Sequence, residues 1–141
     1  MSKKSAKIAA LIERCQGQSK DAHYLGYFEC FNQQLFYEAH DVLEELWLSQ
    51  RDGPNYAFYK GLIQLAGAFV HLQKDRLRPA AALLKLSRKY LAAYPALYEE
   101  LDLEKTRRII DDWLAKLEQA SFEKNPLPEN APPQLKIKHL R

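Results

Sequence analysis

One segment near the middle of the chain, residues 56–74 (YAFYKGLIQLAGAFVHLQK), is apolar on nearly every side of the helix that its residues favour. A helix of that kind is stable only where other elements surround it. The apolar run is too short and too often interrupted to cross a membrane, for which about 18 uninterrupted apolar residues are needed. The segment therefore predicts the central helix of a helical bundle.

Amphipathic helical patterns lie on both sides of this central segment. Apolar residues recur at spacings of three and four, so that one face of each helix would be apolar and the other polar. Asn32 can cap or kink a helix, and Pro79 fits the first turn of one. The helices predicted from these patterns cover residues 4–15, residues 21–49 with a break at Asn32, residues 79–94 and residues 103–120.

The segments between these patterns predict loops, and no segment predicts a strand. Asp52, Gly53 and Pro54 form the clearest loop, since they combine turn residues with a block to helix formation. Residues 124–141 are rich in proline and have no periodicity, so we expect an extended, basic tail packed through Leu135 and Ile137. The predicted fold is an all-α, single-domain bundle of about five helices over residues 1–123, followed by this tail.

Composition narrows the classes of function. The chain has 141 residues, 47% of them hydrophobic and 28% charged, which is ordinary for one globular domain. A net charge of +3, from 21 Lys and Arg against 18 Asp and Glu, falls short of the basic surface of a dedicated nucleic-acid binder. Cys15 and Cys30 fit neither a metal motif nor a disulfide framework, which favours a reducing compartment. The start of the chain lacks the apolar core of a signal peptide, so we expect a cytoplasmic protein.

Polar side chains interrupt the apolar faces of two neighbouring helices. Tyr37, His40, Glu44 and Trp47 share one face of the helix that ends near residue 49, because residues three, four and seven apart lie on the same side. The central helix carries a second stripe, formed by Lys60, Gln64, Gly67 and His71. A short loop makes the two helices antiparallel neighbours. The two stripes therefore predict a shared polar groove, with Lys60 near Trp47 and Glu44, and His71 near Tyr37.

Buried polar groups in such a groove need partners, and two solutions are open. His40, Glu44, Gln64 and His71 could hydrogen-bond to one another. Alternatively, His40 and Glu44, at i and i+4, could both point at one divalent cation, with His71 as a third ligand. Glu38, Asp41 and Glu45 form what looks like a solvated acidic face, so we assign them no role.

The segments that carry the two polar stripes also resemble a known protein family. FNQQLFYEAHDVLEELW, followed after a short loop by FYKGLIQLAGAFVHLQK, resembles the bacterial and archaeal family called domain of unknown function 309, over roughly residues 28–95. The family is all-helical, and its signature is a His, three residues, a Glu, two residues and an aromatic. Here it falls on His40, Glu44 and Trp47. The resemblance implies that His40 and Glu44 are metal ligands, and it implies no activity.

Two hypotheses for the function follow. In the first, the protein binds a divalent metal ion through His40 and Glu44. In the second, it is a non-catalytic module whose groove takes a small ligand or a protein segment, or is closed by a structural hydrogen-bond network. The groove residues in this view are Tyr37, Trp47, Lys60, Gln64 and His71. No nucleophile elbow, phosphate loop or dinucleotide-binding fingerprint appears in the sequence, so no catalytic residue is predicted.

Overall fold

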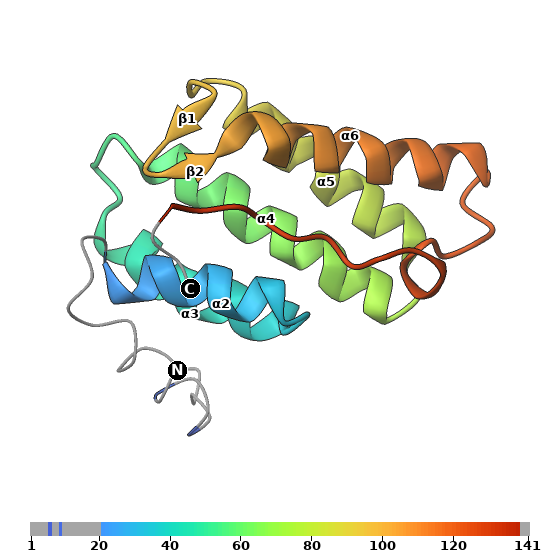
Figure 1. Ribbon diagram of the computed structural model, residues 1–141, viewed down its shortest axis with the longest axis horizontal. Helices are drawn as coiled ribbons and strands as arrows, with labels where there is room; N and C mark the ends of the chain where they lie inside the picture. The colour runs from blue at the N-terminus through green and yellow to red at the C-terminus, as the bar shows by residue number, and fades with distance from the viewer. Residues whose placement is uncertain (1–5, 7–8, 10–20, 139–141) are drawn as a thin grey trace.

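The computed structural model describes residues 6, 9 and 21–138, so most of the helix predicted over residues 4–15 lies outside the described residues. Within residues 21–138 the fold is a single, mostly helical domain in which each helix packs against the next one in the sequence (Figure 1). The five helices of this part are α2 (Ala22–Asn32), α3 (Phe36–Ser49), α4 (Tyr56–Gln73), α5 (Leu77–Leu91) and α6 (Leu103–Gln119). The predicted helical bundle is confirmed.

Residues 56–74 were predicted to form the central helix, and α4, which covers most of them, does lie between the α2–α3 pair and the α5–α6 pair (Figure 1). Gly61 explains how closely α5 approaches it. A Cβ atom at Gly61 would lie 2.8 Å from Cγ and Cδ2 of Leu91, a separation that real Cβ atoms do not show. The backbone contact is completed by Ser87, a buried side chain whose Oγ donates a hydrogen bond of 2.7 Å to the Gly61 carbonyl oxygen.

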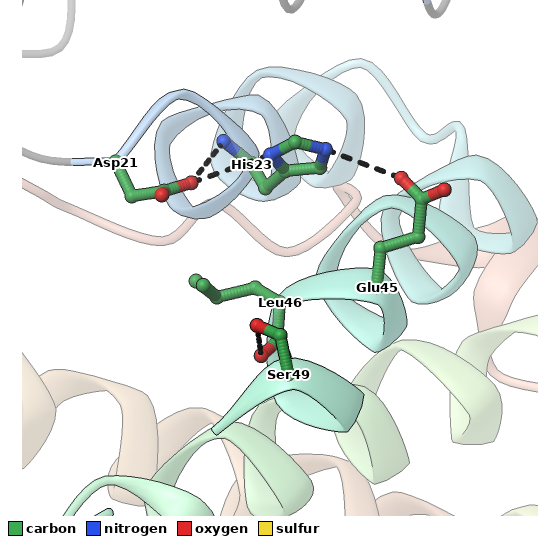
Figure 2. A network of polar contacts seen from close by, with 5 residues as sticks. All are labelled: Asp21, His23, Glu45, Leu46 and Ser49. Atoms are coloured by element: carbon green, nitrogen blue, oxygen red, sulfur yellow. Dashed lines mark hydrogen bonds and ion pairs between the residues drawn. The ribbon is translucent and has the colours of Figure 1, made fainter.

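The break predicted at Asn32 is confirmed, because α2 ends there. Gln34 has a φ of 66°, a left-handed conformation that no helix continues through. At the other end of α2, the carboxylate of Asp21 caps the helix by accepting a hydrogen bond of 2.7 Å from the His23 N–H. His23 also joins α2 to α3, since its Nε2 lies 3.1 Å from Oε2 of Glu45 (Figure 2).

The prediction that no strand is present was wrong. β1 (Leu97–Tyr98) and β2 (Leu101–Asp102) pair as a short antiparallel hairpin between α5 and α6. Its two turn residues, Glu99 and Glu100, have φ values of 49° and 66°, as in the type I′ turn that Asn-Gly normally forms. Two glutamates carry none of that turn signature. Tertiary contacts hold the turn instead, because the Tyr24 hydroxyl donates a hydrogen bond of 2.9 Å to the Glu99 carbonyl oxygen.

The last part of the described chain returns along α2. After a short 3₁₀ helix, η1 (Leu127–Glu129), the chain is extended and crosses the molecule between α6 and α2 (Figure 1). Leu135 and Ile137 are 3% and 6% exposed, in keeping with the contacts expected for them. Asn32 binds the Leu135 backbone from both sides, with its Nδ2 donating to the carbonyl oxygen at 3.0 Å and its Oδ1 accepting from the N–H at 2.8 Å.

None of the helices in the described part of the chain is both long enough and apolar enough to cross a bilayer.

Candidate metal centre and the adjacent cavity

The polar face of α3 gathers three side chains that can bind a metal. His40 and Glu44 are four residues apart and Asp41 and Glu44 are three apart, so all three project from about one turn of the helix. Each is partly buried. They hold this position because the opposite face of α3, which includes Ala39 and Leu43, is fixed in the core with both side chains 0% exposed.

The three groups converge. One ligand atom from each of His40, Asp41 and Glu44 lies within 4.8 Å of the others. Ligands on opposite sides of a bound first-row metal ion are separated by about 4.2 Å, twice a bond length of about 2.1 Å, and adjacent ligands are closer. Closing the group around an ion therefore requires movements of about an ångström, which side-chain rotations supply.

A cavity of about 240 Å³ adjoins this group, and His40 belongs to both. It lies where α3, α4 and α5 meet, and apolar side chains form much of its wall. The residues that line it are Tyr37, His40, Ile63, Gln64, Gly67, Val70, His71 and Leu83. The antiparallel packing of α3 and α4 thus brings Tyr37, Gln64 and His71 together, whereas Trp47 and Lys60 are not among the lining residues.

Three polar atoms of the cavity wall take no part in a direct hydrogen bond between the described side chains. These atoms, Nδ1 of His40, Oε1 of Gln64 and Nδ1 of His71, are covered from solvent and have no hydrogen-bond partner among the described residues. Each such atom costs about 1–3 kcal/mol if it stays unsatisfied.

Burial and neighbouring charges act on His71 together. Removal from water lowers the pKa of its imidazole below the ordinary value, and the positive charges of Arg76 and Lys74 lower it further. His71 is therefore neutral near pH 7, with one ring nitrogen as a donor and the other as an acceptor.

Trp47 and Lys60 lie further along the same helices and contact other aromatic residues. The Trp47 ring packs on Tyr56, with centroids 5.2 Å apart, and its Nε1 is covered without a hydrogen-bond partner among the described residues. The Lys60 ammonium lies 5.0 Å from the centroid of the Tyr90 ring, a cation–π contact between α4 and α5. Neither side chain belongs to the converging group on α3.

Asp41 is the residue that sequence reasoning missed. It was grouped with Glu38 and Glu45 as part of a solvated face, yet it is partly buried and completes the group of three, while His71 does not belong to that group. The spacing did contain the information, because Asp41 precedes Glu44 by three residues and so shares its side of the helix. Glu45, one residue further on, instead contacts His23 (Figure 2).

A comparison with known families gives one match. The family model described as "Domain of unknown function (DUF309)" matches residues 24–83. Residues 24–83 are a DUF309 domain. The match begins four residues before the segment that the resemblance indicated and ends earlier, in α5. No curated protein and no solved structure matches the chain.

The DUF309 domain contains the whole candidate site. It runs from α2 through α3 and α4 into the first half of α5. The converging group on α3 and every lining residue of the cavity fall within residues 24–83, with Leu83 at its end. The hairpin, α6 and the extended C-terminal segment lie outside the match and cover other faces of the bundle.

Proposed function

We propose that the protein binds one divalent metal ion through His40, Asp41 and Glu44. The observation that supports this is the convergence of one imidazole and two carboxylates, with ligand atoms within 4.8 Å of one another, on the partly buried face of α3. Two carboxylates repel each other when they are brought together, and a dication relieves that repulsion while it replaces the water that burial removes.

The ligand set favours a first-row transition metal. Imidazole suits zinc, iron and nickel, and carboxylates suit manganese and the other hard ions, so Mn²⁺, Fe²⁺ and Zn²⁺ fit a site with one nitrogen and two oxygen ligands. No thiolate of the described residues takes part, since Cys30 is buried on α2 and is not a member of the group. A soft ion such as Cu⁺ is therefore not expected.

Three protein ligands leave at least one coordination position for water. This is the pattern of metal sites that act on a bound molecule, whereas structural zinc sites use four protein ligands. The open position would lie beside the cavity, because His40 belongs to both. The carboxylates of Asp41 and Glu44 would accept protons or hydrogen bonds from the metal-bound water.

The test is metal uptake by protein purified without a His tag, measured by elemental analysis and by calorimetric titration with Zn²⁺ and Mn²⁺. One equivalent is expected to bind. Less than about a tenth of an equivalent as purified, together with no stoichiometric uptake in the titration, would remove the proposal.

Two variants identify the ligands. Glu44→Gln keeps the size of the side chain and removes its charge, so we expect affinity to fall by about 100-fold, in line with the loss of a charged ligand. Glu45→Gln makes the same change on the next residue, whose side chain is 52% exposed and contacts His23, and it should leave affinity within about twofold. Equal effects of the two substitutions would mean that the ion binds to the acidic surface of α3 in general.

A further inference from the structure

The two glycines within α4 differ in what surrounds them. Glycine inside a helix lowers stability relative to alanine, so each position needs a reason. Gly61 has one, because its Cβ would lie 2.8 Å from two atoms of Leu91. At Gly67 the added Cβ would meet only Cδ1 of Leu83, at 3.2 Å, which is the end of a flexible side chain. Packing therefore demands glycine at Gly61 and not at Gly67, where the missing side chain leaves room in the cavity.

The cavity wall, as far as the described residues form it, contains no carboxylate, ammonium or guanidinium group. Ile63, Val70 and Leu83 supply apolar surface, and Tyr37, Gln64 and the two histidines supply the polar atoms. In the metal-free protein, a ligand with a full charge would lose its water here without a countercharge in direct contact, which is unfavourable. An uncharged ligand loses less on entry, and the apolar wall favours it.

The polar atoms of the wall have unused hydrogen-bonding capacity. Oε1 of Gln64 is an acceptor that is covered from solvent and has no donor among the described residues, and Nδ1 of His71 is likewise covered and has no hydrogen-bond partner there. Both side chains line the cavity. A ligand that carries one N–H or O–H group would give Gln64 the donor that it lacks.

Aromatic surface lies at the mouth of the cavity. Tyr37 is 60% exposed, which is unusual for so large an apolar side chain, and its ring lies within 15° of parallel to that of His40 with centroids 6.4 Å apart. Flat rings favour flat ligands, because offset stacking adds to the burial of apolar area. The cavity volume of about 240 Å³ is below the range of about 300–1,000 Å³ typical of sites for drug-sized molecules, so the ligand has one or two rings.

We propose that this cavity binds a small, uncharged, planar ring compound with an N–H or O–H donor, whose hydrogen bond Gln64 accepts and whose ring lies against Tyr37 and His40. This goes beyond metal binding, since it uses the wall formed by α4 and α5 as well as α3. It does not depend on a bound ion.

The test uses indole as the probe, in the presence of a chelator so that the result is independent of the metal site. In a ¹H–¹⁵N NMR titration we expect saturable shifts of the Gly67 backbone amide and of the Gln64 side-chain amide, with a Kd on the order of 1 mM. Indene has nearly the same shape and lacks the N–H, so it should bind about fivefold more weakly. Benzoate, a charged ring compound, should give no saturable shift.

Two variants test the assigned positions. Gly67→Ala puts a methyl group into the cavity and should weaken indole binding at least about fivefold without lowering the melting temperature, because alanine favours the helix. Gln64→Leu keeps the side-chain volume and should remove the preference for indole over indene. Because the two changes are independent, the proposal stays testable if either variant fails to fold.

Several results would overturn the proposal. The absence of saturable shifts at indole concentrations up to about ten times the expected Kd would mean that the cavity holds only water. Equal binding of indene would refute the role of Gln64, and equal binding of benzoate would refute the uncharged character of the ligand. Undiminished binding to Gly67→Ala would show that the probe binds elsewhere. If indole does not bind but the protein takes up one equivalent of metal, only the cavity proposal fails. If indole binds as expected but no metal is taken up, only the metal-site proposal fails.

Discussion

Replacing Gly61 by alanine tests how α4 and α5 are packed. The new Cβ would lie 2.8 Å from Cγ and Cδ2 of Leu91 and 3.3 Å from Cβ of Tyr90. Leu91 is 0% exposed, so its side chain lies within the packed core. Overpacking of this kind costs about 1–3 kcal/mol, and the gain from replacing glycine by alanine in a helix offsets about 0.5–1 kcal/mol of it. We expect Gly61→Ala to lower the free energy of unfolding by about 1–2 kcal/mol.

The assay is urea unfolding followed by far-ultraviolet circular dichroism, with a thermal scan that should show a fall in Tm of about 3–8 °C. Gly67→Ala is the matched control, since it makes the same change six residues along the same helix. There the Cβ meets only Leu83 Cδ1 at 3.2 Å, and we expect stability to be unchanged or raised by up to about 1 kcal/mol. If Gly61→Ala were as stable as Gly67→Ala, the close approach of α5 to Gly61 would be refuted.

Three further predictions concern other parts of the fold. The pKa of His71 is lowered on folding, so the unfolded chain takes up a proton at this residue first as the pH falls, and stability should decrease from about pH 7 to pH 5. His71→Gln should make the decrease in Tm over this pH range smaller, and an identical pH profile of the variant and the wild type would contradict this prediction. Asn32→Ala removes two hydrogen bonds to the Leu135 backbone and should cost about 1–3 kcal/mol. The measurement is faster amide exchange at residues 134–138, and unchanged exchange would show that other contacts hold the segment. Gln34→Gly relieves a left-handed conformation at φ 66° and should raise the free energy of unfolding by about 0.5–1 kcal/mol in urea, while a loss of stability would mean that the Gln34 side chain contributes more than its backbone costs.

The helices could be predicted from the sequence because their cause is local. The apolar stripes at helical spacing gave α6, predicted as 103–120 and found as Leu103–Gln119, and the nearly continuous apolar surface of α4 gave its central position. Where the cause was tertiary, prediction failed. The hairpin turn at Glu99 and Glu100 is held by contacts with residues far away in the sequence, such as the Tyr24 hydroxyl, and nothing in the two glutamates indicates it.

Prediction of the candidate site depended on the same distinction. Helical spacing and a short loop were enough to predict that Tyr37, Gln64 and His71 would lie near one another, since antiparallel neighbours bring the start of α3 opposite the end of α4. The same reasoning did not identify Asp41, because Asp41 was grouped with the nearby Glu38 and Glu45 as part of a solvated acidic face. Only the structure gives the burial that separates Asp41 from Glu45.

The most direct measurement of the central claim is anomalous diffraction from crystals grown with Zn²⁺ or Mn²⁺. We expect one strong anomalous peak on α3, within about 2.0–2.2 Å of a nitrogen of His40 and of carboxylate oxygens of Asp41 and Glu44. The side chains would have closed on it from the separation of up to 4.8 Å that they have in the present structure. A peak bonded to fewer than two of these three residues, or a peak elsewhere on the molecule with none here, would contradict the assignment of this group as the metal site.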